Sequence, residues 1–348
     1  MRLGLQLSYT NGIRDVADEI IDLEAAGLQL VSVPEAYSFD SVSQLGYLAA
    51  VTERLELSSG IMQVLTRTPA LVAMTAASLD HASAGRFSLG IGASGPQVIE
   101  GFHGASYERP LTRLREIIEI CRVVWRRERL EHSGSYYTVP LSSGFGTDVG
   151  KALKLVNEPL RERIPITVAA IGPRSVRMAA EVAEGWEPAF FFPERARQVW
   201  GASLDSGLAK RAPGLGPLDI VASAPCAIGE GLDTVPASSR EQLALYLGGM
   251  GTQSENFYRE LAIRYGFADA ATEIQEHYLA GRKRAAEAAV PDELIAGTSL
   301  VGAPERVAER LSALREAGVT TLKIALPQTD RRDRRRTVET LRGMIDAL

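Results

Sequence analysis

One segment of the chain, RFSLGIGASGP at residues 86–96, has the residue types and spacing of an anion-binding corner. From Phe87 to Ile91, apolar residues alternate with small ones, a pattern that predicts one short strand. The glycines at 92 and 95 permit close backbone approach, and Pro96 suits the first position of a helix. Because a helix start presents free N–H groups, this order of strand, turn and helix could bind an anion. The same pattern is equally typical of a tight turn that binds nothing, so the surrounding elements decide between the two.

The cysteines and histidines do not indicate a metal centre or a disulfide. Cys121 continues an apolar helical face over residues 114–124, and Cys226 lies in the strand-like segment Ile220–Ile228. Neither has a partner at the Cys-x-x-Cys spacing. The histidines are too scattered for the spacings of metal ligands: His81, His103, His132 and His277. We therefore expect a protein without a bound metal.

Composition and charge are those of an ordinary globular protein. The 348 residues are 45% hydrophobic and 23% charged, and the net charge of −5 gives no general attraction to nucleic acid or to an anionic membrane. The first residues, MRLGLQL, read directly as a strand without a signal-peptide pattern, and no apolar run reaches membrane-spanning length. We expect a cytoplasmic protein whose partner is a small molecule.

Strand and helix patterns alternate along the chain in eight units. Such alternation predicts a parallel sheet, because each helix returns the chain to the same end of the sheet. Eight units, with no Gly-x-Gly-x-x-Gly after the first strand, favour a closed α/β fold, the (β/α)8 TIM barrel, over an open doubly wound sheet. The expected strands are Leu3–Ser8, Leu28–Val33, Leu55–Gln63, Phe87–Ile91, Ile164–Ile171, Trp186–Phe191, Asp219–Ile228 and Thr321–Leu326.

Two long excursions interrupt this alternation. We expect insertions after strands four and seven, at about residues 128–162 and 229–296, within a single domain that covers residues 1–348. In such a barrel the functional groups lie at the carboxyl ends of the strands, and we expect both excursions to leave from that face and cover it. The fold places these positions there: Ser8–Tyr9, Glu35–Tyr37, Gly60–Met62, Ala93–Gly95, Gly172–Ser175, Glu187 and the residues after Ile228.

Four segments carry a resemblance to a known superfamily. The first is Ser59–Gln63 together with Arg67–Pro69, the second is Gly85–Gly101, the third is Ala170–Arg174, and the fourth is Tyr246–Gly251 together with Asn256–Tyr258. In these segments the sequence resembles the bacterial-luciferase-like superfamily and, within it, the deazaflavin (coenzyme F420)-dependent oxidoreductases. The resemblance covers nearly the whole chain. The glycine-rich segment is the most diagnostic. The features that separate users of F420 from users of FMN are less sharp, so FMN is the alternative cofactor.

The resemblance implies a cofactor site at the carboxyl ends of strands three to five. Family members hold a non-prolyl cis peptide beneath the central ring of the cofactor, and the matching bond here joins Gly60 to Ile61. The phosphate-bearing tail needs donors of the kind that a helix start and an arginine supply. The matching cofactor residues are Gly60, Ile61, Met62, Ser94, Gly95, Gln97, Gly172, Pro173, Arg174 and Ser175. An ordinary strand end, turn or helix cap is the alternative interpretation of each.

The predicted catalytic residues are Glu35 and Tyr37, just after the second strand. The resemblance places polar active-site residues there, so we expect Glu35 to act as an acid, base or electrostatic partner and Tyr37 as a proton donor or substrate contact. The segment reads Glu-Ala-Tyr, unlike the Asp-His of sugar-phosphate dehydrogenases in the family, which argues against the same substrate. A capping glutamate and a packed tyrosine are the structural alternative.

The resemblance implies an oxidoreductase that transfers a hydride between F420 and a small organic substrate, in a homodimer. A luciferase-type monooxygenase that uses reduced FMN and oxygen is the first alternative. A barrel that binds a flavin-like ligand without catalysis is the second. Oxygen reactivity of the bound cofactor separates the first two, because carbon in place of flavin N5 suppresses that reactivity.

Overall fold

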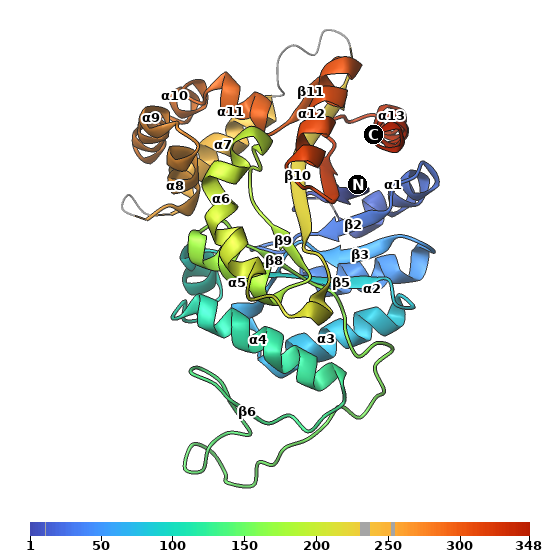
Figure 1. The fold of residues 1–348 in the computed structure, drawn as a ribbon, viewed down its shortest axis with the longest axis vertical. Coiled ribbons are helices and arrows are strands. Elements are labelled where there is room, and N and C mark those ends of the chain that lie inside the picture. Colours follow the sequence, from blue (N-terminus) through green and yellow to red (C-terminus); the bar gives the residue numbers. More distant parts are fainter. Residues whose placement is uncertain (11, 230–236, 252–254) are drawn as a thin grey trace.

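Eight parallel strands close into a barrel in the computed structural model, which describes residues 1–10, 12–229, 237–251 and 255–348 (Figure 1). Each strand pairs with the next, and the last returns to the first through Arg2 opposite Thr321. The prediction of a (β/α)8 barrel is therefore confirmed. The barrel strands are β1 (Arg2–Gln6), β2 (Leu30–Val33), β3 (Glu56–Ser59), β5 (Phe87–Gly92), β8 (Ile166–Ala169), β9 (Gly185–Glu187), β10 (Asp219–Ile228) and β12 (Thr321–Ala325).

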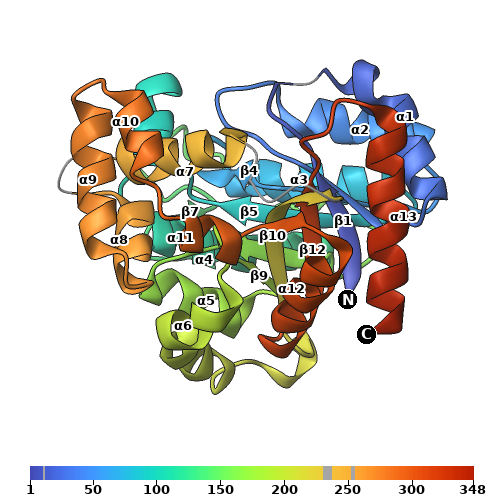
Figure 2. The same ribbon diagram turned by 90° about the horizontal axis from the view of Figure 1, so that it is seen from above.

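Helices cover the outside of the barrel, and the terminal helix α13 lies beside α1 (Figure 2). Prolines at 69, 110, 173, 193 and 304 each open one of these helices, at a position where the missing N–H has no helical partner. The outer helices are α1 (Ile13–Ala25), α2 (Ser41–Val51), α3 (Pro69–Ala82), α4 (Pro110–Trp125), α5 (Pro173–Val182), α6 (Pro193–Leu208), α12 (Pro304–Glu316) and α13 (Arg331–Ala347). Short 3-10 turns occupy Val64–Thr66 and Pro213–Leu215.

Alternation along the strands separates an apolar shell from a polar interior. On β1, Leu3 and Leu5 are fully buried in the core that the strands share with the helices. Arg2, Gly4 and Gln6 have the opposite orientation, because successive side chains of a strand point to opposite faces. The inside of the barrel therefore carries small and polar side chains, which are the groups that could bind a ligand or take part in a reaction.

The third strand is interrupted where one continuous strand, Leu55–Gln63, was expected. β3 ends at Ser59, and β4 (Met62–Gln63) pairs with β5 after the break. The peptide between Gly60 and Ile61 is cis, as the resemblance implies. A Cβ at Gly60 would lie 1.8 Å from Ser32 Oγ, so this position requires glycine.

The first excursion begins at the opposite end of the barrel from the one expected. It follows α4, and a helix in a (β/α)8 barrel runs back toward the amino ends of the strands, so residues 126–165 start there. This excursion contains the hairpin β6 (His132–Ser133) and β7 (Thr138–Val139), and Figure 1 shows it extending away from α4. The prediction that both excursions leave from the carboxyl-end face is therefore wrong.

The second excursion does follow the carboxyl end of a strand, β10. It continues into β11 (Leu300–Gly302), which pairs with the last residues of β10. Residues 230–236 and 252–254 of the predicted insertion lie outside the described residues. The division into one domain stays a prediction. The helices of this excursion are α7 (Ala237–Gly249), α8 (Phe257–Arg264), α9 (Ala268–Leu279), α10 (Lys283–Ala288) and α11 (Asp292–Gly297).

Candidate active site

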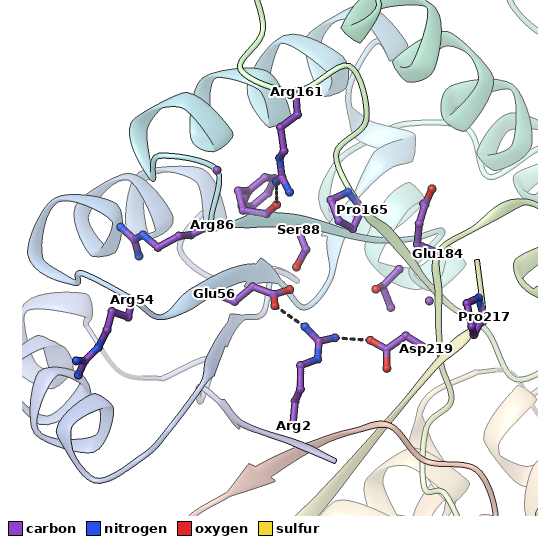
Figure 3. A pocket seen from close by; sticks show the side chains of 14 residues that line it. Arg2, Arg54, Glu56, Arg86, Ser88, Arg161, Pro165, Glu184, Pro217 and Asp219 are labelled. Atoms are coloured by element: carbon purple, nitrogen blue, oxygen red, sulfur yellow. Dashed lines mark hydrogen bonds and ion pairs between the residues drawn. The ribbon is translucent and has the colours of Figure 1, made fainter. Parts of the chain in front are cut away.

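A cavity of about 480 Å³ opens at the amino ends of the strands, and its charged groups hold the barrel together (Figure 3). The Arg2 guanidinium lies between the carboxylates of Glu56 and Asp219. Arg86 donates to backbone carbonyls, and Arg161 pairs with Asp80. Because these charges are compensated, this end stabilises the barrel, and the functional groups of a (β/α)8 barrel lie at the opposite, carboxyl ends of the strands.

At the carboxyl ends, β3 and β4, β5 and β8 are consecutive neighbours in the sheet. The segments that follow them, around residues 60–63, 93–97 and 170–175, therefore meet at one mouth of the barrel. The structure thus brings the predicted cofactor residues to a common face, next to the β2–α2 connection that carries Glu35 and Tyr37.

A buried polar network lies beneath Gly60. The Lys323 ammonium, on a residue only 2% exposed, pairs with Glu187 Oε1 at 2.5 Å and donates to Ser32 Oγ at 3.1 Å. Gln6 Nε2 donates to the Gly60 carbonyl at 3.3 Å. Lys323 was absent from the sequence predictions, although a lysine inside the apolar strand 321–326 is the signal that could have found it.

The Gln63 side chain is fully buried, and within the described ranges neither its amide nitrogen nor its amide oxygen has a hydrogen-bond partner. Gln63 lies opposite Gly92 in the ladder between β4 and β5, at the carboxyl end of both strands. A buried amide without partners is costly, so such a group indicates a ligand or water that completes its hydrogen bonds. Gln63 belongs to one of the segments that carry the family resemblance, but it was not among the predicted site residues.

The turn after β5 is held in place by two long-range hydrogen bonds. Ser94 has a left-handed φ of +59°, and the Tyr107 hydroxyl donates to its carbonyl at 2.9 Å. The Gln97 amide donates to the Gly251 carbonyl of the second excursion at 2.7 Å. The helix expected at Pro96 is present as a short π-helix, Gln97–Phe102, a form that occurs often at functional sites.

The start of α5 retains the features of an anion site. Gly172 and Pro173 occupy the N-cap and first helical positions, and Ser175 Oγ donates locally to the Gly172 carbonyl at 2.9 Å. Arg174 is exposed, and its guanidinium has no partner among the described residues. Free helix-start amides beside an unpaired guanidinium favour a phosphate group.

Glu35 is buried and saturated with hydrogen bonds. Its carboxylate accepts two from Arg67, at 2.5 and 2.9 Å, and two from the backbone N–H and hydroxyl of Ser41, at 2.9 and 2.8 Å. Burial alone would raise the pKa of this carboxyl, but the hydrogen bonds from Arg67 and Ser41 outweigh it and lower the pKa. Glu35 is thus a fixed negative charge that holds Arg67 and the start of α2, and these contacts favour positioning over proton transfer.

Tyrosine hydroxyls and exposed rings line the mouth. Tyr37 is 64% exposed, and its ring lies 6.2 Å from the ring of Phe102. Tyr9, after β1, hydrogen-bonds to Tyr246 of the second excursion. Burial, followed by Tyr246 and Glu187, raises the pKa of the Tyr9 phenol and so favours its protonated form. Among the described residues, Tyr9 and Tyr37 are two groups at the mouth that could donate a proton.

No group of three or more His, Cys, Asp or Glu side chains in the described part of the chain is arranged to hold a metal ion. Cys121 and Cys226 are free and buried, and burial raises the pKa of both thiols. Of the helices in the described ranges, none is long and apolar enough to span a membrane.

Comparison with known proteins places the chain in a family. The model of the family described as luciferase-like monooxygenase matches residues 1–321. This chain belongs to that family. A Mycobacterium tuberculosis protein named as a coenzyme F420-dependent oxidoreductase, Rv3520c, is 37% identical over 331 residues, covering 93% of this chain and 94% of the relative. The predicted resemblance to the luciferase-like superfamily is confirmed.

Solved structures of other proteins share the fold. A coenzyme F420-dependent tetrahydromethanopterin reductase from Methanopyrus kandleri is 21% identical with a TM-score of 0.79, and the match covers 98% of this chain and 96% of that one. The oxygenating constituent of 3,6-diketocamphane monooxygenase from Pseudomonas putida, solved with FMN, is 19% identical with a TM-score of 0.65, over 98% and 96% of the two chains. The barrel thus occurs with both cofactors.

Proposed function

We propose that this protein transfers a hydride between coenzyme F420 and a small organic substrate. The observation that carries the proposal is the carboxyl-end mouth, where the unpartnered amide of Gln63, on β4, and the unpaired guanidinium of Arg174, after β8, lie on either side of β5. A planar ring with a polar edge and a phosphate-bearing tail would satisfy both groups. The name of the relative that is 37% identical supports F420 over FMN.

Residues at different positions of the mouth would contact the ring of the cofactor, its tail and the substrate. Gln63 would hydrogen-bond a polar edge of the ring, and the α5 start with Arg174 would hold the tail phosphate. At Gly60, Gly90 and Gly92 a Cβ would collide with Ser32, Ser59 and Ile61, so glycine allows close packing at these strand ends. Bound F420 supplies or accepts the hydride. Tyr9 would exchange the accompanying proton with the substrate, and Tyr37 would contact the substrate.

Anaerobic turnover tests this function. Reduced F420, the protein and a panel of aldehydes and ketones are mixed without oxygen, and oxidation of F420 is followed. We expect one F420 oxidised for each substrate molecule reduced. Activity that requires reduced FMN and oxygen would instead support the monooxygenase alternative, and binding of F420 without turnover on any panel member would support the non-catalytic barrel.

Replacing Arg174 by Ala is expected to weaken F420 binding by about 10- to 100-fold, because the exposed guanidinium provides a charge-assisted hydrogen bond to phosphate. Fluorescence titration with oxidised F420 measures the effect. Arg177, also exposed but in the second turn of α5, is the matched control, and Arg177→Ala should bind F420 as the parent protein does. Equal affinities of the Arg174→Ala variant and the parent would contradict the assignment of the tail site.

Replacing Gln63 by Leu is expected to weaken F420 binding without lowering the unfolding free energy of the free protein. Leucine has a similar volume and removes the unsatisfied amide, so the free protein should keep or gain up to about 1–2 kcal/mol of unfolding free energy. F420 affinity should nevertheless fall about tenfold, since the ring edge loses its partner. Urea unfolding and F420 titration give the two values. A destabilised variant with unchanged affinity would show that Gln63 is only structural.

We also propose that the protein is a homodimer. Six apolar side chains between residues 140 and 162 are 53–87% exposed: Leu141, Phe145, Val149, Leu153, Val156 and Leu160. Such surface is unusual on a monomer, and this stretch is as long as one side of a standard interface. A second copy, with exposed Leu71 and Met74 on α3, would cover it.

Light scattering of the parent protein should give twice the chain mass. The double variant Leu153→Asp, Val156→Asp should give the mass of a single chain. A parent protein that is monomeric at micromolar concentration would contradict this.

A further inference from the structure

Resting on the proposed function, we infer that the substrate is an uncharged molecule that carries an aromatic or alicyclic ring. We call the side chains of Tyr37, Phe39, Phe102 and His103 the aromatic rim. The structure assigns the substrate ring to this surface.

The aromatic rim is built from two connections at the carboxyl ends. Tyr37 and Phe39 lie between β2 and α2, and Phe102 and His103 lie at the end of the π-helix that follows β5. The Phe102 ring is 6.2 Å from Tyr37 and 5.1 Å from His103, the latter edge to face. The rings of Tyr37, Phe102 and His103 thus lie next to one another, although Tyr37 and Phe102 are more than sixty positions apart in the chain, and Phe39 follows Tyr37 on the same connection.

Exposure of these rings indicates a binding surface. Tyr37, Phe39 and Phe102 are 64%, 70% and 66% exposed. Large side chains of this type are normally buried, and several exposed together mark a ligand or partner site. The rim adjoins the proposed chemistry, because Tyr37 follows β2 and Tyr9 follows β1, and these two strands pair in the barrel. Its position at the barrel mouth therefore favours a small-molecule substrate.

Charge around the rim disfavours an anionic substrate. The described residues of the connections that meet here, 7–10, 12, 34–40 and 93–109, include the carboxylates Glu35, Asp40, Glu100 and Glu108 and one arginine, Arg109. Arg109 pairs with Glu108 and donates to the Ser135 carbonyl. Glu35 is neutralised by Arg67. A phosphate or carboxylate on the substrate would therefore meet negative charge, and the described residues of these connections offer it no free cation, which costs binding free energy.

The test measures binding to protein saturated with oxidised F420, so that no turnover occurs. The probes are 2-naphthaldehyde, which is uncharged and aromatic, and glucose 6-phosphate, which is a charged sugar. Titration calorimetry is performed on the parent, on Phe102→Ser and on the control Tyr47→Ser. Tyr47 is 38% exposed on the outer helix α2, so the control also removes an exposed ring, outside the rim and outside the proposed dimer surface.

We expect 2-naphthaldehyde to bind the parent at least tenfold more tightly than glucose 6-phosphate. Phe102→Ser should weaken naphthaldehyde binding about tenfold while F420 affinity stays unchanged, and Tyr47→Ser should alter neither. Tighter binding of glucose 6-phosphate, or equal naphthaldehyde affinity in the parent and Phe102→Ser, would overturn the inference. Failure of the proposed function would appear separately, as absence of F420 binding in the first step.

Discussion

Replacement of Lys323 by Met is expected to lower the free energy of unfolding by about 3–5 kcal/mol. Lys323 and Glu187 form an ion pair inside the barrel, and their side chains are only 3% and 13% exposed. Methionine fills a similar space but leaves the Glu187 carboxylate with a single neutral donor, Ser223 Oγ at 3.3 Å. The loss is the cost of a buried charge without its partner. Urea unfolding monitored by tryptophan fluorescence measures it.

The control for Lys323→Met is the double variant with Glu187→Leu. When both charges are replaced by apolar groups no buried charge remains, and most of the lost stability should return. Two results would contradict a stabilising role of the ion pair. One is parental stability of Lys323→Met, and the other is a double variant that is less stable than either single variant. The pair also matters to the site, since Lys323 donates to Ser32, which packs directly beneath Gly60.

The second large effect is expected at Glu35. Glu35→Gln should cost about 3 kcal/mol, because it leaves the largely buried Arg67 guanidinium without its counter-charge. The pH dependence of unfolding gives a distinct signature. The pKa of Glu35 is lowered in the folded protein from its ordinary value of 4.5. Its contribution to stability is therefore fully present above about pH 4.5 and is lost as the pH falls through the folded-state pKa below that value.

Comparison of the parent with Glu35→Gln between pH 3 and pH 7 tests this contribution. The stability difference between them should shrink on acidification, because the parent carboxylate becomes protonated too. Turnover by the folded fraction of Glu35→Gln should keep the parental pH profile if Glu35 is a positioning residue. A variant of parental stability that loses only turnover would restore the original prediction of Glu35 as the catalytic acid or base.

The strands and helices could be predicted from the sequence because their patterns are local. The alternation of apolar residues located all eight barrel strands. The sixth strand ends early, at Glu187, because Pro188 lacks an N–H and Phe190 has a left-handed φ of +49°. The direction of the first excursion was mispredicted because it depends on which end of the barrel a helix reaches.

The candidate site was less predictable, because its chemistry depends on distant partners. The environment of Glu35 is set by Arg67, 32 positions later, and no pattern in the Glu-Ala-Tyr segment indicates that pairing. Lys323 donates a hydrogen bond to Ser32, which lies 291 positions earlier in the chain. The positions of Gly60, Ser94 and Arg174 at the mouth followed from the strand ends alone. Their roles in cofactor binding stay a prediction.

The central claim is that this barrel binds F420 and uses it in preference to FMN. Paired fluorescence titrations of the purified protein with oxidised F420 and with FMN test it most directly, with the buried tryptophans at 125, 186 and 200 as reporters. We expect saturable quenching by F420 and at least 100-fold weaker binding of FMN. Tight binding of FMN with no binding of F420 would contradict the account and assign the site to flavin chemistry.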